Sequence, residues 1–136
     1  MTIPTIGKPW PEQGGIYAGQ RLIDGKAHHI IVSPGVEHDI EGVEFRDVEK
    51  VVAEVDEING FSDWRAPDHE DLMLAYVNVP DQFSRTGGLN SVYWSRSEHH
   101  GWTWAVDFEY GYVLSYDRRD YEFQVRPVRS FVFEQT

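Results

Sequence analysis

The feature that most constrains the fold of this chain is an alternation of apolar and polar residues in its last third. The apolar positions of the first such segment are Trp102, Trp104, Val106 and Phe108. A spacing of two places these side chains on one face of a strand, and Tyr110-Gly111 then provides a turn. Three further segments of the same kind lie at 112–116, 121–125 and 128–133. The sequence from residue 91 onward therefore predicts an antiparallel sheet.

Two helices are expected before this sheet. Apolar residues recur at helical spacing at Val48, Val51, Val52, Val55 and Ile58, and Asn59-Gly60 is expected to end that helix. A second helix is expected to begin at Asp68, because Asp68 can accept hydrogen bonds from the first turn and Asp71 complements the positive end of the dipole. Its buried side comprises Leu72, Met73, Ala75, Tyr76 and Val79. Pro80 closes it.

The amino-terminal region combines an arm with a hairpin. Residues 1–15 contain three prolines and Gly14-Gly15, which favours an irregular arm. Strands are expected at 16–18 and 27–32, because Asp24-Gly25 between them tolerates the positive φ angles of a type I′ turn. Residues 1–136 are expected to form one domain of the α+β class, in which two helices pack on a twisted antiparallel sheet.

Composition restricts the setting and the partners. A chain of 136 residues that is 40% hydrophobic can build one core, and it contains no cysteine for a disulfide or a thiolate metal site. No apolar run approaches the roughly 20 residues of a membrane span, and the first residues lack the pattern of a secretory signal, so we expect a cytoplasmic protein. The formal net charge of −11 disfavours direct contact with nucleic acid or an anionic membrane.

Four segments of the second half carry recognisable motifs. They are Asp63-Trp64-Arg65-Ala66-Pro67-Asp68 with Asp71-Leu72, then Tyr93-Trp94-Ser95-Arg96-Ser97-Glu98, then Trp104-Ala105-Val106-Asp107-Phe108 with Gly111, and finally Val125-Arg126-Pro127-Val128-Arg129. In order and spacing they resemble the signatures of the DUF1566 proteins, also called Lcl C-terminal-like domains. The segment from Trp10 to Gly19 is similar to a variant common in bacteriophage and prophage genomes.

The resemblance implies a C-type-lectin-like fold, which these domains share with the formylglycine-generating-enzyme group. Ala66, Asp68, Asp71 and Arg96 replace the usual Leu, Thr, Glu and Ser of the family patterns. The formylglycine-generating relatives work through cysteines and copper, and this chain has no cysteine. The sequence also has no Gly-rich phosphate loop, no Gly-x-Ser-x-Gly elbow and no His-Glu-x-x-His helix, so we expect a non-catalytic binding module without a cofactor.

Several motif residues are expected to be structural. Trp64 and Trp94 should lie in the core, with each indole N–H bonded to a carbonyl. Arg65, Arg126 and Arg129 should tie loops and strand ends to carboxylates or carbonyls. The pairs His28-His29 and His99-His100 point to opposite faces of a strand, so no metal site is expected.

The loops of the last sheet are the first candidate binding surface. They combine basic and aromatic residues, which are frequent at binding hot spots: Arg96, His99, His100, Tyr110, Tyr112, Tyr116, Arg118 and Arg119. The expected partner is a protein or a small ligand, and the sequence does not choose between them.

An acidic face over 37–57 is the alternative surface. Its carboxylates include Glu44, Glu49, Glu54 and Glu57. This face would suit a phage-encoded inhibitor that docks on a basic site of a host defence protein. A third hypothesis, a receptor-binding module of a virion, follows from the lectin-like resemblance. Edge strands of the sheet could also pair into a homodimer.

Overall fold

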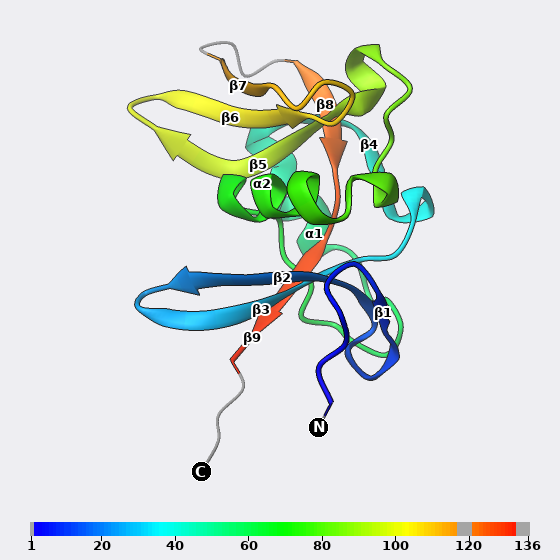
Figure 1. Ribbon diagram of the computed structural model, residues 1–136. Coiled ribbons are helices and arrows are strands. Elements are labelled where there is room, and N and C mark those ends of the chain that lie inside the picture. The colour runs from blue at the N-terminus through cyan, green and yellow to red at the C-terminus, as the bar shows by residue number, and fades with distance from the viewer. Residues whose placement is uncertain (1, 117–120, 133–136) are drawn as a thin grey trace.

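A computed structural model describes residues 2–116 and 121–132, and for Ser115 and Tyr116 it describes the backbone alone. The described residues form two sheets with one helix between them (Figure 1). The first sheet contains, in spatial order, β1 (Pro9–Trp10), β2 (Gly15–Ile23), β3 (Lys26–Val32) and β9 (Val128–Phe131). The second contains β4 (Ile40–Glu44), β8 (Glu122–Val125), β5 (Val92–His99), β6 (Trp102–Asp107) and β7 (Val113–Tyr116). The α+β class is confirmed, whereas the expected single sheet is wrong.

The expected amino-terminal hairpin is confirmed. β2 and β3 pair from Ile16↔Val32 to Ile23↔Lys26, and the turn residues Asp24 and Gly25 have φ angles of 51° and 80°. The preceding arm is more ordered than expected, because β1 pairs with the start of β2 and Trp10 is only 2% exposed. Apolar contact with the core thus fixes this proline-rich segment.

The second helix, α2 (His69–Asn78), begins and ends where the sequence predicts, with Asp68 as its N-cap and Pro80 just beyond it. The first helix, α1 (Val48–Ala53), is shorter than predicted. Glu54, Asp56 and Glu57 would lie at the negative end of a longer helix dipole, which is unfavourable. Ile58 instead forms a bridge with Phe61 around the Asn59-Gly60 turn.

Short 3-10 helices connect the larger elements, and they span Pro11–Gln13, Val36–His38, Phe45–Asp47, Pro80–Gln82 and Gly88–Ser91. Among the helices of residues 2–116 and 121–132, none has the length and apolar character needed to span a membrane.

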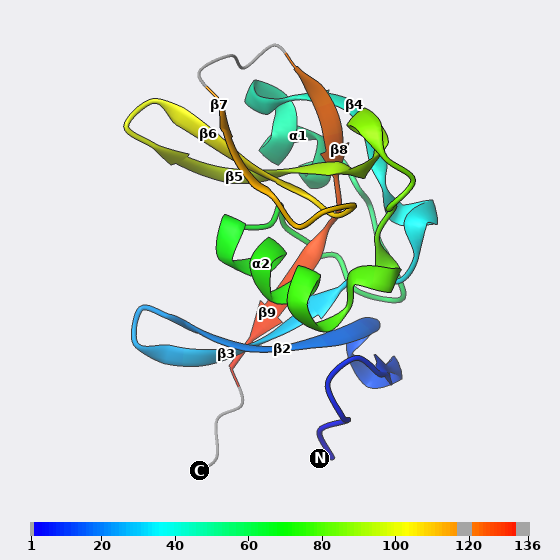
Figure 2. The same cartoon turned by 45° about the horizontal axis from the view of Figure 1, so that its top comes forward.

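The two α-helices cover opposite faces of the second sheet (Figure 2). Val52 of α1 packs in one core cluster with Trp94, whereas Leu72 of α2 packs in the other with Tyr93. Neighbouring residues of a strand point to opposite faces, so β5 is buried on both sides. α2 also contacts β2, which places it between the sheets.

The crossing between the sheets was not predicted. β8 pairs with β4 and, through Tyr93↔Gln124, in parallel with β5, but β9 pairs with β3 of the first sheet. The chain changes sheet at Arg126-Pro127 (Figure 1). Period-two alternation marks both segments as strands, yet it does not specify a strand's partner.

Predictions about the core motifs are confirmed. The Trp64 indole N–H donates to the carbonyls of Ile58 (3.1 Å) and Phe61 (3.0 Å). The Trp94 indole N–H donates to the carbonyl of Val43 at 2.7 Å. These bonds satisfy polar groups inside the core, where an unmet donor would cost free energy.

The terminal motif is held by its two arginines. Arg126 is 0% exposed, and it donates from Nε to the buried Asp39 carboxylate at 2.7 Å and from Nη1 to the Ser33 carbonyl at 3.1 Å. The Tyr93 hydroxyl donates to the same carboxylate at 2.7 Å. Asp39 is therefore a structural residue, although it lies within the acidic stretch.

We expect Arg126→Met to lower the free energy of unfolding by about 3–5 kcal/mol, because it leaves the Asp39 carboxylate buried without its cation. Urea denaturation followed by circular dichroism would measure this change. The control, Arg46→Met, removes a solvent-exposed partner of Glu44 and should cost no more than about 1 kcal/mol. The double variant Asp39→Asn/Arg126→Met should be less destabilised than the sum of the single variants; full additivity would contradict the ion-pair explanation.

Candidate ligand-binding site

The start of α2 is fixed by a reciprocal pair of carboxylates. The backbone N–H of Asp68 donates to the Asp71 carboxylate at 2.8 Å, and the Asp68 carboxylate accepts from the backbone of Asp71 in return. This capping box satisfies donors that a helix end leaves open. The helix therefore begins at a defined residue, and His69 and Glu70 occupy its first turn.

Three arginines from three parts of the chain converge on these carboxylates. Arg21 of β2 donates from Nη1 to Asp71 at 2.7 Å and to Asp68 at 3.1 Å. Arg65 donates to Asp71 at 2.7 Å, and Arg96 donates from Nε to Asp68 at 2.7 Å. Burial alone would raise the pKa of Asp68, but the hydrogen bonds from Arg96 and Arg21 outweigh it and hold that pKa below its usual value.

A bulge in β5 brings that strand to the helix. The pairs Trp94↔Ala105 and Glu98↔Thr103 leave Ser95, Arg96 and Ser97 opposite Trp104 alone. The backbone N–H of His69 donates to Ser97 Oγ at 3.0 Å, and the N–H of Arg96 donates to the Pro67 carbonyl at 2.8 Å. The extra residues of a bulge redirect side chains, and here they turn toward the start of α2.

A pocket of about 390 Å³ lies between the helix start and the β5–β6 hairpin. Its lining residues are His69, Glu70, Ser97, Glu98, His99 and Trp104, and we call it the hairpin pocket. The His69 ring stacks on the half-buried Trp104 indole, with centroids 5.3 Å apart and planes inclined by 24°. Glu70 approaches His69 Nδ1 at 3.0 Å. An aromatic surface beside carboxylates and a hydroxyl can bind a ligand through both stacking and hydrogen bonds.

The aromatic surface extends beyond the pocket. Trp102 is 45% exposed and pairs across the strands with His99, which places both side chains on the face of Trp104. Trp102, Trp104, Val106 and Phe108 share one face of the strand as predicted, but only Val106 and Phe108 of this face are fully buried. The β5–β6 hairpin extends past the start of α2, so the helix does not cover the sheet face there (Figure 1).

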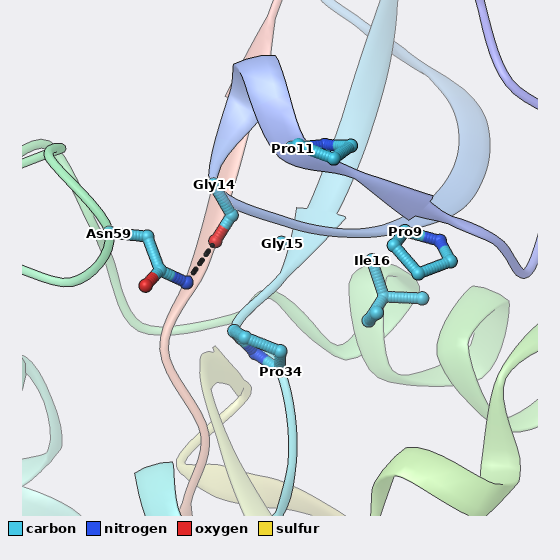
Figure 3. Close-up of a pocket in the computed structure, with 7 residues that line it drawn as sticks. All are labelled: Pro9, Pro11, Gly14, Gly15, Ile16, Pro34 and Asn59. Carbon is cyan, nitrogen blue, oxygen red and sulfur yellow. Dashed lines mark hydrogen bonds between the residues drawn. The ribbon is translucent and has the colours of Figure 1, made fainter.

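Two further hollows have different linings. One, of about 410 Å³, is lined by Pro9, Pro11, Gly14, Gly15, Ile16, Pro34 and Asn59 (Figure 3). The only polar side chain in this lining is that of Asn59. It donates to the Gly14 carbonyl at 2.9 Å and so attaches the amino-terminal arm to the Asn59-Gly60 turn. The other, also about 410 Å³, lies between Asp39 and the loop at 84–90. Neither lining contains a histidine.

Arg96, His99 and His100 are the predicted binding residues that lie near the hairpin pocket. His99 lines it, and the His100 ring packs against His99 with centroids 4.2 Å apart. Arg96 is half-buried and bound to Asp68, so its main role is to hold the bulge. The hydrogen bond to Asp68 raises the pKa of Arg96.

Two of the predicted tyrosines, Tyr110 and Tyr112, lie away from that pocket. Tyr110 and Tyr112 lie on the β6–β7 turn, at the opposite end of β6 from His99, and are 65% and 60% exposed. Tyr116 pairs with Thr103 through its backbone, and its side chain lies outside the described atoms. Arg118 and Arg119 lie outside the described residues. Among the predicted residues with described side chains, Arg96, His99 and His100 therefore lie at one end of β6, and Tyr110 and Tyr112 lie at the other.

The acidic face is divided by local ion pairs. Glu44 on β4 contacts Arg46 at 2.9 Å, and Glu54 contacts Lys50 at 4.0 Å. Glu49 on α1 is exposed and lies 3.8 Å from Arg96, next to the bulge. Glu57 is exposed beyond the helix. Exposed pairs of this kind leave most of the negative field in place.

Sequence reasoning missed most of the pocket. The sequence motifs assign no binding role to His69 and Glu70, and they contain Ser97 and Glu98 only as parts of a family pattern. The period-two spacing of Trp102 and Trp104 was a usable signal, since a strand that projects beyond its covering helix exposes such a face. Within residues 2–116 and 121–132, no group of three or more His, Cys, Asp or Glu side chains is arranged to hold a metal ion.

We expect Asp68→Asn to lower the free energy of unfolding at pH 7 by about 1–3 kcal/mol, because asparagine caps the helix but lacks the charge that Arg21 and Arg96 contact. The pKa of Asp68 is depressed in the folded state, so its stabilisation is complete above the unfolded value of about 3.9 and is lost as the pH falls through the folded pKa. Urea titrations across this range should show the difference between wild type and variant narrowing in acid. Asp81→Asn, at an exposed pair with Arg85, is the control, and a difference independent of pH would contradict the assignment.

Comparison with known proteins agrees with the motifs. No curated protein gives a significant match to this chain. The family model of the Lcl C-terminal domain matches residues 24–129, a stretch that includes the capped helix, the bulged strand and the terminal arginine motif. The chain therefore belongs to the Lcl C-terminal domain family.

Proposed function

We propose that this chain is a non-catalytic binding module that recognises a protein or a small ligand through the hairpin pocket. The observation that supports it best is the stack of His69 on the half-buried Trp104, with Glu70 and Glu98 beside it. Binding sites combine aromatic surface with a few polar groups held in place. Here the capping box and the bulge provide that support.

Rigidity of the surrounding structure supports the same function. The pocket joins a helix end to a strand, and the contact between Ser97 and His69 connects them directly. Side chains placed by such elements lose little conformational freedom when a ligand binds. The proposal that the module is not an enzyme rests on the sequence, which lacks the nucleophile and phosphate-binding motifs named above.

We further propose a C-type-lectin-like fold and a bacteriophage or prophage setting, with the protein acting in the host cytoplasm. The support for the fold is the family resemblance together with an architecture of two helices and paired sheets. The support for the setting is the Trp10–Gly19 segment. Its role is structural, since Arg129 donates to the Gln13 carbonyl at 2.7 Å and so attaches this segment to the terminal motif.

A second candidate function is inhibition of a host defence protein through the acidic face. It is favoured by the exposure of Glu49, Glu54 and Glu57 on and after α1. Virion-associated receptor binding is a third candidate, supported by the fold resemblance alone.

To test the hairpin pocket, ¹⁵N-labelled protein would be screened by NMR against sugars, nucleotides, amino acids and short peptides. We expect perturbed amides to cluster at 69–70 and 97–99, and the Trp104 indole to shift. Trp104→Ala and His99→Ala should each weaken binding of a ligand so found at least about fivefold, since truncated hot-spot residues cost more than about 1 kcal/mol.

Two comparisons make the screen decisive. His99 is exposed, so His99→Ala should leave the melting temperature unchanged even if Trp104→Ala lowers it. Tyr110→Ala removes an exposed aromatic ring at the other end of β6 and should not affect binding. Ligand shifts that cluster at 110–112, with loss of binding in Tyr110→Ala, would place the site at the β6–β7 turn instead.

The inhibitor alternative predicts a different response. Reversal of Glu49, Glu54 and Glu57 to Lys should abolish a partner complex recovered from host lysate, and that complex should weaken steeply as salt rises. Pull-down at low and high salt with mass spectrometry would measure both effects. Retention of the complex by the triple variant would exclude this function for the acidic face.

A further inference from the structure

The hairpin pocket continues into a second, smaller hollow. That hollow has a volume of about 220 Å³ and is lined by Phe45, Arg46, Val48, Glu49, Arg96 and Glu98. Glu98 lines both hollows, so they adjoin at this residue. The surface that carries the stacked His69 and Trp104 therefore adjoins the acidic face at Glu49.

Three carboxylates and two arginines line this combined surface. Glu49, Glu70 and Glu98 lie along it, and all three are exposed. The cations that line it have acidic neighbours: Arg96 is bound to Asp68 at 2.7 Å and lies 3.8 Å from Glu49, and Arg46 contacts Glu44 at 2.9 Å. In a chain of net charge −11, such a surface attracts cations and repels phosphates and carboxylates.

The aromatic part of the surface selects among cations. An indole face beside carboxylates binds a guanidinium or ammonium group through cation–π attraction and charge-assisted hydrogen bonds together. The Trp104 indole lines the same pocket as Glu70 and Glu98, and Trp102 on the same face of β6 is exposed. An arginine side chain would place its charge near the carboxylates and its planar group against the rings.

We propose that the two hollows form one docking surface for a basic segment of a protein partner, in which an arginine side chain enters the hairpin pocket and a neighbouring basic residue lies beside Glu49. This inference rests on the proposed binding function and names the chemistry of its partner. It also joins His99 of the predicted loop surface to Glu49 of the predicted acidic face, which the sequence presents as separate alternatives.

The test uses a peptide that alternates arginine with glycine, and a control peptide in which citrulline replaces each arginine. Citrulline keeps the shape of arginine and lacks its charge. By NMR, the arginine peptide should shift amides at both hollows, near 97–99 and near 48–50. Its affinity should fall at least about tenfold between 50 and 500 mM salt, and the citrulline peptide should bind at least about tenfold more weakly.

Variants then separate the two parts of the surface. Glu98→Gln and Glu49→Gln should each weaken the arginine peptide several-fold, whereas Glu12→Gln, which removes an exposed carboxylate from the amino-terminal arm, should not. Each variant removes one charge from an exposed position, so a change in net charge alone would affect all three equally.

The other outcomes overturn the inference in distinguishable ways. Equal binding of the citrulline peptide, or shifts confined to the hairpin pocket, would exclude the joint basic-segment site but leave the proposed binding function standing. If the arginine peptide shifts no amide but a sugar or nucleotide shifts the Trp104 indole, the joint basic-segment site is likewise excluded and the proposed binding function stands. If no compound shifts the amides of the hairpin pocket or the Trp104 indole, both proposals are contradicted.

Discussion

The arrangement of the whole molecule depends on the buried carboxylate of Asp71. It accepts hydrogen bonds from Arg21, Arg65 and the backbone of Asp68, so a side chain that would be costly to bury becomes a point of attachment. Arg21 belongs to the first sheet, and Arg96, which binds the neighbouring Asp68, belongs to the second. One helix end thus sets the position of both sheets.

The same chemistry recurs at the carboxyl-terminal motif and explains the character of the surface. Arg126 binds Asp39 inside the protein, and Arg129 binds Asp63 while its guanidinium lies 3.8 Å from the centre of the Phe61 ring. Much of the scarce positive charge is therefore engaged in internal contacts. The exposed part of the chain is left acidic, and a neutral or basic partner meets less electrostatic opposition than an anionic one.

Local signals in the sequence predicted local structure well. The Asp24-Gly25 turn and the capping residues of α2 depend on neighbours within a few positions, and both are where expected. The family motifs likewise identified the arginines and tryptophans of the core. Features that depend on residues far apart in the sequence were predicted less well. The length of α1 was overestimated because the Ile58 side chain joins the core from outside the helix, where the backbone of Ile58 bridges to Phe61. The split into two sheets depends on pairing partners that alternation does not encode.

The candidate site was the least predictable part, for a physical reason. It exists because Ser95, Arg96 and Ser97 form a bulge that turns β5 toward His69. Periodicity does not reveal extra residues inside a strand, so the sequence could place His99 near an exposed turn but could not join it to a helix about 30 residues earlier.

The pairing of β3 with β9 has a consequence for how the protein is made. One edge of β3 pairs with β2, but on its other edge Val32 pairs with Val128, so that edge stays open until β9 has been synthesised. Contacts between such distant residues slow folding, because a long loop must close before they form. The second sheet also requires β8 beside β4, and Arg126 can reach Asp39 only after both strands exist. The first sheet therefore cannot be completed before β9 is synthesised. Until then, the apolar residues of the β2–β3 hairpin lack part of their packing.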